Sequence, residues 1–262
     1  DHWCGGWDDL FPNDEVATVD GVRYPDHGEL WTAHWEYETD TSAGDLTVRL
    51  RTDCPISGVQ IEKQITLPVD GERLVVRYRI RNRRRRDLKY LWKLHPALAV
   101  SPGDRIEIPA RRVRLEPRFL GTLEGGALQS DWPILPVGDR SVDLRVAPPP
   151  SRKDLYFFYA LLLKEGWCAT YSPSGKLAVG LSFPLEVFST CWVFASYGGW
   201  NDYYVTVLEP SSGYPFRLEE AVCSGHCGVL PASGAQEATV ILSVCQGVSG
   251  VAGVLPDGRI VC

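Results

Sequence analysis

The sequence predicts an all-β fold, a large antiparallel sandwich or barrel built from many short strands. Three observations favour this class. Apolar and polar residues alternate with a period of two in several segments, turn motifs separate these segments, and none keeps the 3.6-residue period of an amphipathic helix. Because all-β domains commonly reach about 200–250 residues, we expect the 262 residues to form a single domain, 1–262.

The alternation is clearest in residues 73–81. From Val76 onward, apolar side chains at even positions alternate with arginines at odd positions, as in a half-buried strand. By the same criterion we expect strands at 46–51, 59–67, 73–81, 90–100, 105–108, 112–116, 142–146, 155–163, 167–171, 176–183, 190–197, 203–208 and 238–246.

Turn signals separate the expected strands. Asp20-Gly21, Asp70-Gly71, Ser174-Gly175 and Asp257-Gly258 are dipeptides that favour hairpin turns. Residues 148–150 are three consecutive prolines and predict a stiff loop. This loop is the best candidate for an internal boundary, but strand patterning continues on both sides of it.

Charge and hydropathy exclude several classes of protein. The formal net charge is −6, which disfavours nucleic-acid binding, because phosphate neutralisation needs clustered Lys and Arg. The run Arg83–Arg86 could form an anion-binding patch, but the acidic total favours a solvated hairpin tip. No run approaches 18 apolar residues, so we expect no membrane-spanning segment.

The N-terminus and the cysteines suggest a cytoplasmic protein. Residues 1–4 lack the basic and apolar regions of a signal peptide, and the lack of Met leads us to expect that N-terminal residues are missing. The 8 cysteines contain no CxxC pair, so reduced thiols are expected. The closest cluster is Cys223, His226 and Cys227, whose spacing is a poor match to a zinc site.

Three titratable residues lie in unusual surroundings. His27 is in a turn before Gly28, whereas His95 and Glu209 each end an apolar strand and precede a proline. A carboxylate that closes an apolar strand is costly unless it has partners or a chemical task. Flat aromatic rings near such polar groups suit sugar rings, whose C–H faces are apolar. The nearby aromatic residues are Trp7, Trp31, Trp35, Trp92, Trp200 and Tyr214.

Each of these signals also has a structural explanation. A lone histidine in a strand is commonly a satisfied core residue, a Glu before Pro is commonly a strand-end surface charge, and tryptophans commonly belong to the core. From the residues alone, the prediction stops at a soluble all-β domain with a capacity to bind carbohydrate.

At these residues the sequence resembles the aldose 1-epimerase, or galactose mutarotase-like, superfamily. Its members carry a histidine in a His-Gly turn, a second histidine in a His-Pro motif and a late glutamate that closes an apolar strand. His27-Gly28, His95-Pro96 and Glu209-Pro210 follow in this order. Residues 168–179 resemble the late hairpin of the family, and Asp154 is at the position of a sugar-binding aspartate. The resemblance covers roughly residues 5–246.

The resemblance implies an antiparallel β-supersandwich that interconverts the α and β anomers of an aldose without a metal or cofactor. Glu209 would take the proton of the anomeric hydroxyl, and His95 would protonate the ring oxygen. His27 would bind a hydroxyl or help to polarise the ring oxygen, and Asp154 would accept sugar hydroxyls. Trp7, Trp31 and Tyr214 are the candidate sugar-binding aromatic residues. We therefore expect His27, His95, Asp154 and Glu209 to line one concave pocket.

Departures from the family pattern bear on the substrate. Relatives that act on hexose 6-phosphates carry His-Gly-x-x-Arg-x-x-x-Trp, whereas this chain has Trp31 at the arginine position and matches only the final Trp35. Sugar mutarotases carry an arginine some way before the first histidine, a position that falls near the start of this sequence, and no arginine stands there; a glutamine of the family site is not evident around residues 189–192. These differences favour a neutral or differently substituted sugar over a sugar phosphate.

Two other functions fit the same residues. A non-catalytic carbohydrate-binding protein would keep the fold and the aromatic platforms, but it would not need an acid–base pair such as His95 and Glu209. A lyase or hydrolase could also use this scaffold, since fold does not fix function, and a second carboxylate about 5–9 Å from Glu209 would support glycoside hydrolysis. The sequence does not predict the oligomeric state.

Overall fold

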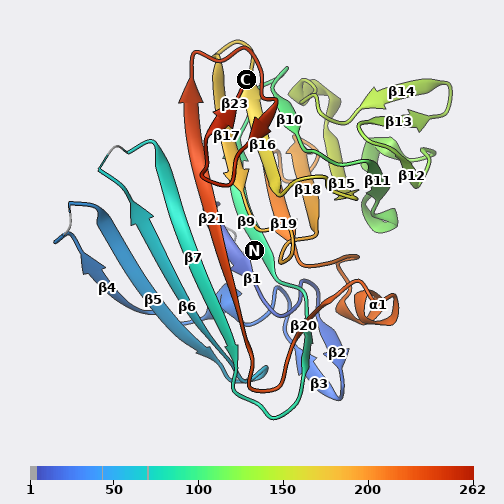
Figure 1. The fold of residues 1–262 in the computed structure, drawn as a ribbon. Coiled ribbons are helices and arrows are strands. Elements are labelled where there is room, and N and C mark those ends of the chain that lie inside the picture. The colour runs from blue at the N-terminus through green and yellow to red at the C-terminus, as the bar shows by residue number, and fades with distance from the viewer. Residues whose placement is uncertain (1–4, 43, 70) are drawn as a thin grey trace.

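The computed structural model describes residues 5–42, 44–69 and 71–262, and it confirms the all-β, antiparallel prediction. Two large sheets form a sandwich (Figure 1). The N-terminal tetrapeptide considered above as a signal sequence, and Asp70 of the expected Asp70-Gly71 turn, lie outside the described residues.

The seven-stranded sheet carries the candidate residues on β9 and β19. All of its strand pairs are antiparallel. Its order is β1 (Trp7–Leu10), β9 (Lys93–Ala99), β19 (Tyr204–Ser211), β18 (Thr190–Tyr197), β15 (Asp154–Leu161), β11 (Arg112–Leu115) and β12 (Gln129–Asp131).

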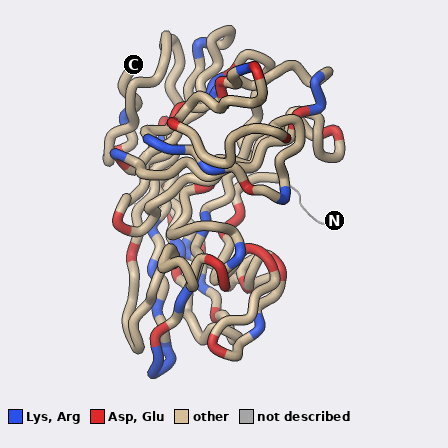
Figure 2. The backbone as a smooth tube through the Cα atoms, turned by 90° about the vertical axis from the view of Figure 1, so that its right-hand side faces the viewer, with Lys and Arg blue, Asp and Glu red and all other residues tan. Residues whose placement is uncertain are grey.

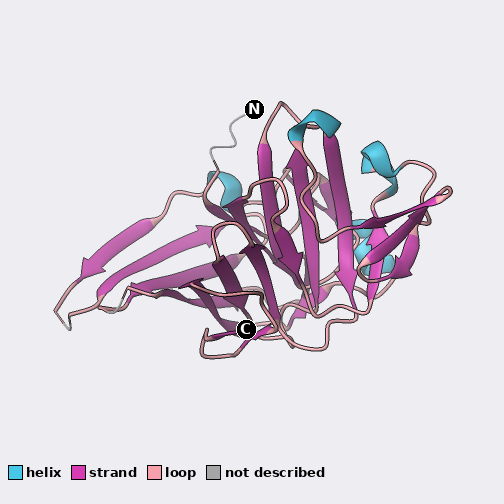
Figure 3. Cartoon of the chain, turned by 90° about the horizontal axis from the view of Figure 1, so that it is seen from above, coloured by secondary structure: helices cyan, strands magenta, loops and turns pink. Residues whose placement is uncertain are grey.

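The eight-stranded sheet forms the second layer and is also antiparallel. The part made by β4, β5 and β6 extends beyond the seven-stranded sheet (Figure 3). Its order is β10 (Arg105–Glu107), β16 (Trp167–Ser172), β17 (Leu177–Ser182), β21 (Ala235–Gln246), β7 (Arg73–Asn82), β6 (Val59–Leu67), β5 (Leu46–Cys54) and β4 (Glu36–Asp40).

Short elements complete the described fold. Four two-stranded sheets pair β2 (Ala17–Val19) with β3 (Val22–Tyr24), β8 (Leu88–Tyr90) with β20 (Gly228–Leu230), β13 (Ile134–Val137) with β14 (Arg140–Asp143) and β22 (Gly253–Val254) with β23 (Ile260–Val261). The helices are α1 (Leu218–Cys223) and the 3-10 turns η1 (Leu30–Thr32), η2 (Pro117–Phe119), η3 (Gly121–Leu123) and η4 (Pro150–Arg152). Strands from both sides of the triple-proline loop lie in both large sheets.

All but one of the expected strands correspond to strands of the two large sheets, with differences at their ends. The exception is 142–146, which overlaps β14 only at residues 142–143, and β14 pairs with β13 in a separate two-stranded sheet. The expected strand 90–100 is divided, because β8 ends at Tyr90 and β9 begins at Lys93. Short strands such as β1 and β4 were not expected. Three to five residues give too few repeats for a period of two to be recognised. The helix α1 has six residues, which is also too short for a helical period.

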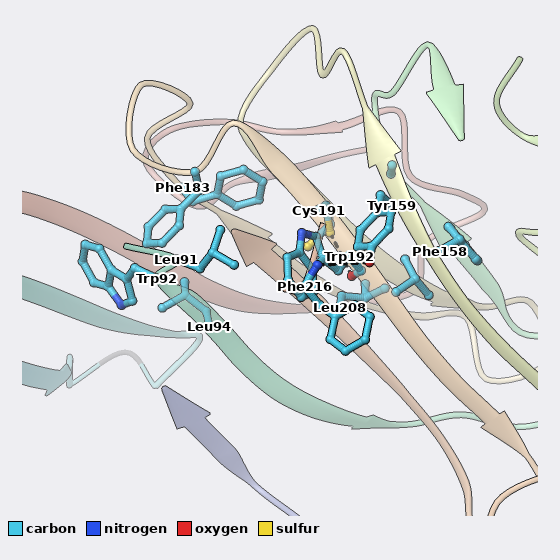
Figure 4. Close-up of a cluster of buried hydrophobic side chains, with 14 of the residues drawn as sticks. Leu91, Trp92, Leu94, Phe158, Tyr159, Phe183, Cys191, Trp192, Leu208 and Phe216 are labelled. Atoms are coloured by element: carbon cyan, nitrogen blue, oxygen red, sulfur yellow. Dashed lines mark hydrogen bonds between the residues drawn. The ribbon is translucent and has the colours of Figure 1, made fainter. Parts of the chain in front are cut away.

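The hydrophobic core lies between the two sheets, and β9 contributes to it with one face (Figure 4). The ring of Trp92, just before β9, contacts Tyr78 of β7 with centroids 5.2 Å apart and Phe188 at 4.8 Å. Leu94 is completely buried. Since side chains alternate between the faces of a strand, the residues on either side of Leu94 project to the opposite face of the sheet.

The arginine run forms the tip between β7 and β8, at the lower end of the molecule in Figure 2. Arg84 donates to the carbonyl oxygens of Pro55 and Ile56, and Arg83 pairs with Asp53 at 3.3 Å. Arg83 and Arg84 therefore hold the neighbouring turn in place. This agrees with the interpretation of the arginine run as a hairpin tip.

Gly28 provides a test of how the turn of His27 is packed. Its φ is +73°, and a Cβ there would lie 2.3 Å from the carbonyl oxygen of Phe11. Gly125 has a similar φ of +79° with nothing within 4 Å of a Cβ. In chemical denaturation we expect Gly125→Ala to cost about 1–2 kcal/mol from backbone conformation alone. Gly28→Ala should cost about 3 kcal/mol or more, because the clash adds to that cost. Equal costs would contradict the close contact.

Candidate functional site

The candidate acid–base residues lie next to each other on β9 and β19. The register pairs Val207 with Ala97 and Ser211 with Lys93, so Glu209 is level with His95 on the neighbouring strand. The alternation that buries Leu94 in the core places Lys93 and His95 on the other face of the sheet. The two sequence motifs, far apart along the chain, therefore meet through the pairing of two strands.

The side chains form a compact, buried cluster of charge. His95 Nε2 lies 3.7 Å from Glu209 Oε1, and the side chains are 11% and 1% exposed. Lys93 Nζ lies 2.6 Å from Glu209 Oε2 and also forms an ion pair with Asp14. The same ammonium lies 4.5 Å from the ring centroid of Trp192. One buried cation is thus shared by two carboxylates and an aromatic face.

Burial shifts the pKa values of the acid–base pair in opposite directions. The loss of water raises the pKa of Glu209 to about 7, although the Lys93 ammonium opposes this rise. Burial also holds the pKa of His95 well below its usual value, and Lys93 adds to that effect. Since the two groups are close, they titrate as a unit. Between the low pKa of His95 and about pH 7, the pair holds one proton in total.

A second histidine faces the pair from the turn before η1. His27 has a φ of +60°, and its Nδ1 lies 2.8 Å from Asp26 Oδ2. The His27 ring lies 4.6 Å from the Trp31 ring, and the Trp31 ring lies edge-on to His95 at 6.4 Å. The hydrogen bond with Asp26 orients the ring through Nδ1 and directs Nε2 toward another partner.

These residues line one cavity of about 590 Å³, a size within the usual range for small-molecule sites. Polar groups and aromatic rings contribute in similar numbers. The lining residues are Asp14, Glu15, Asp26, His27, Trp31, Lys93, His95, Arg118, Phe119, Leu155, Phe157, Phe194, Trp200, Val207, Glu209 and Phe216.

Comparison with solved structures identifies the fold. No family model and no curated protein sequence matches the chain. The protein Slr1438 from Synechocystis is 19% identical with a TM-score of 0.67, and the match covers 92% of this chain and 78% of that one. A candidate aldose 1-epimerase from Klebsiella pneumoniae is 13% identical with a TM-score of 0.70, with 93% of this chain and 62% of that one covered.

A third structure carries the family description in its name. A galactose mutarotase-related enzyme from Lactobacillus acidophilus is 14% identical with a TM-score of 0.60, and the match covers 94% of this chain and 85% of that one. The chain has the galactose mutarotase-like fold. At these identities the similarity establishes the architecture, and the chemistry must be argued from the residues of this chain.

Within the mutarotase-like fold, the structure brings together four of the predicted site residues. His27, Trp31, His95 and Glu209 all line the cavity, and Asp154 does not. Asp154 is completely buried elsewhere, where it accepts hydrogen bonds from Thr122 and Tyr156 and pairs with Arg152 at 2.9 Å. The prediction that Asp154 lines this pocket is therefore wrong. Its carboxylate is instead bound by Thr122, Tyr156 and Arg152.

The other two aromatic candidates also lie outside the cavity lining. Trp7, on β1, has its ring 5.9 Å from Lys63 Nζ. Tyr214 stacks on His226 with ring centroids 4.5 Å apart. The sequence places both residues in promising motifs, but a motif does not specify the direction in which a side chain points.

Several residues that line the cavity were not among the predicted site residues. Lys93 had a usable signal, because it precedes His95 by two positions in a strand and must share its face. Asp14 had none, since it follows β1 in a loop and reaches Lys93 only through folding. The sequence pattern around the aromatic residues of β15 and β18 is typical of core strands. Only the order of strands in the sheet places these residues beside the acid–base pair.

The described residues contain no group of three or more His, Cys, Asp or Glu side chains suited to a metal ion. In the Cys223, His226 and Cys227 cluster, the imidazole instead stacks on Tyr214. Among the helices that the structure describes, none has the length and apolarity to cross a membrane.

Removal of the shared cation should be strongly destabilising. Lys93→Met leaves the carboxylates of Asp14 and Glu209 buried without their cation, and breaking a buried pair costs about 3–5 kcal/mol. Lys153→Met removes a solvent-exposed pair with Asp202 and should change the stability far less. Urea denaturation at pH 8 measures both costs. The Lys93→Met cost should shrink at pH 5, where Glu209, whose pKa burial raises to about 7, is protonated and no longer leaves an unpaired charge. Similar costs for the two variants would contradict the assignment.

Proposed function

We propose that the chain is an aldose 1-epimerase that interconverts the α and β anomers of a sugar by acid–base ring opening. The observation that carries this proposal is the buried His95–Glu209 pair, with Nε2 and Oε1 3.7 Å apart in a cavity of about 590 Å³. Both groups can reach one sugar ring, which the reaction requires. The likeness to mutarotase-like structures supports the same class of reaction.

The proton balance of the reaction suits a pair that holds one proton. The form that reacts carries the proton on His95 beside the Glu209 carboxylate, and it is the less populated of the two one-proton forms because the pKa values favour the proton on Glu209. In this form Glu209 takes the proton of the anomeric hydroxyl while the bond from C1 to the ring oxygen breaks. The bonding electrons pass to the ring oxygen, which takes the proton of His95, and the sugar becomes an open-chain aldehyde. After rotation about C1–C2, closure on the other face reverses both transfers. The pair holds one proton before, during and after ring opening.

The surrounding groups have supporting roles in this proposal. Lys93 holds Oε2 of Glu209, which directs Oε1 toward His95 and stabilises the carboxylate form. His27, fixed by Asp26 through Nδ1, would bind a sugar hydroxyl through Nε2. Trp31 would cover one face of the sugar ring. Asp154, Trp7 and Tyr214 receive no sugar-binding role here because they do not line the cavity.

A carbohydrate-binding protein without activity is the second candidate. The aromatic part of the cavity favours sugar binding by itself. The buried acid–base pair favours the enzyme, because a binding module gains nothing from a carboxyl whose pKa is raised to about 7.

Glu209→Gln should separate the two functions. Mutarotation of freshly dissolved α-anomers, followed by polarimetry or proton NMR, should be accelerated by the wild type. The variant should lower kcat/KM by about 100-fold or more, because it removes the base. Calorimetry should still detect sugar binding. Glu186→Gln, an exposed residue, is the matched control and should leave kcat/KM unchanged. Sugar binding without acceleration by the wild type would support the binding protein.

The pH dependence of kcat/KM tests the proton count. Above about pH 7 the pair loses its last proton, so kcat/KM should fall tenfold per pH unit. Below the depressed pKa of His95 the pair holds two protons, and kcat/KM should fall again. The maximum should lie between these limits. A rate that still rises between pH 7 and 9 would contradict the requirement for one proton.

A further inference from the structure

The cavity is divided into a polar end and an aromatic end. The polar end lies on β9 and β19 with the acid–base pair. The aromatic end is a continuous wall of rings from β18, β15 and η2 and from the loops that follow β18 and precede α1. The wall consists of Trp200, Phe194, Phe157, Phe119 and Phe216. Successive centroids are 5.6, 6.2, 5.6 and 6.0 Å apart.

Strand register fixes the relation between the two ends. Glu209 and His95 are level with each other, and one step of two residues along the sheet leads to Val207 and Ala97. Val207 pairs with Phe194, which pairs with Phe157. A sugar whose C1 and ring oxygen contact His95 and Glu209, and whose ring follows β19 in this direction, extends over Val207 and Phe194 toward the aromatic wall. Val207 and the phenylalanine rings have no hydrogen-bonding group. The indole N–H of Trp200 is a donor at one end of the wall, and the guanidinium of Arg118, which lies 4.1 Å from the Phe216 ring, is bonded to Glu15.

The charges in the cavity disfavour an anionic substrate. Among the described residues that line it, the permanently charged cations are Lys93 and Arg118. Lys93 is shared by Asp14 and Glu209, and Arg118 makes two hydrogen bonds of 3.2 and 2.7 Å to the carboxylate of Glu15. A phosphate or carboxylate on the sugar would thus meet carboxylates without a cation to receive it.

Resting on the epimerase activity proposed above, we propose that the substrate is an uncharged aldose that carries an apolar group in place of a hydroxyl at the end of the ring remote from C1. A methyl group, as in a 6-deoxy sugar, or a methoxy group fits the aromatic wall. A free hydroxyl placed over the rings of Phe194, Phe157 and Phe119 gives up its water without finding a partner there, which lowers the affinity for the sugar. The aromatic wall is therefore the specificity determinant of the site.

The test compares matched sugars that differ at one position. kcat/KM for mutarotation is measured by NMR for D-galactose and 6-deoxy-D-galactose, for D-glucose and 6-deoxy-D-glucose, and for D-glucose 6-phosphate. We expect each 6-deoxy sugar to exceed its parent by about tenfold or more, and the phosphate to be the poorest substrate. Equal values for a sugar and its 6-deoxy form, or a preference for the phosphate, would overturn the proposed substrate class.

A variant of the wall tests its role directly. Phe119 is 40% exposed, so Phe119→Asn should fold, and its amide could bond a hydroxyl. The ratio of kcat/KM for the 6-deoxy sugar to that for its parent should fall at least threefold. Tyr37→Asn changes an exposed aromatic residue of β4 outside this cavity and should leave the ratio unchanged. An unchanged ratio in Phe119→Asn would overturn the role of the wall.

The failure of this inference can be distinguished from the failure of the proposed function. If no sugar is accelerated and Glu209→Gln behaves as the wild type, the epimerase proposal fails, and the substrate class with it. If all sugars are accelerated equally through Glu209, the epimerase proposal stands and the inference about the aromatic wall fails.

Discussion

The Lys93 ammonium, held between Asp14 and Glu209, is the interaction on which the site depends. Asp14 lies in the loop after β1, Lys93 on β9 and Glu209 on β19, so the ion pairs join three segments that are distant in sequence. The backbone carbonyl of Asp14 also accepts the amide of His27. Asp14 therefore connects the buried ion pairs with Lys93 to the turn that carries His27.

In the strand β9, alternate side chains serve different purposes: one face packs in the hydrophobic core and the other face lines the cavity. Leu94 faces the core between the sheets, together with Trp92 just before the strand, while Lys93 and His95 face the cavity. A shift of register by one residue would exchange the two sets and place a lysine in the core. Burial of Leu94 thus specifies the direction of His95, so the position of the acid–base pair is linked to the hydrophobic core.

The cavity separates two physical environments over neighbouring strands of one sheet. Charged groups gather over β9 and β19, where they set the proton count of the pair, and aromatic rings gather over β18 and β15. Burial raises the pKa of Glu209 at the charged end. In the proposal above, the aromatic rings at the other end select the substrate.

Local pattern in the sequence determined the fold class and the candidate acid–base residues. Alternation along single strands predicts an antiparallel all-β fold, a sandwich or a barrel, and the motifs around His27, His95 and Glu209 are recognisable without a structure. The tertiary structure decided which strand ends and loops lie beside the acid–base pair, which no local period encodes. It placed Asp154 and Trp7, at the first positions of β15 and β1, and Tyr214 away from the cavity, and it brought the loop residue Asp14 to Lys93. It also decided the pKa of Glu209, because burial depends on every segment that covers a group and not on the residues beside it in the chain.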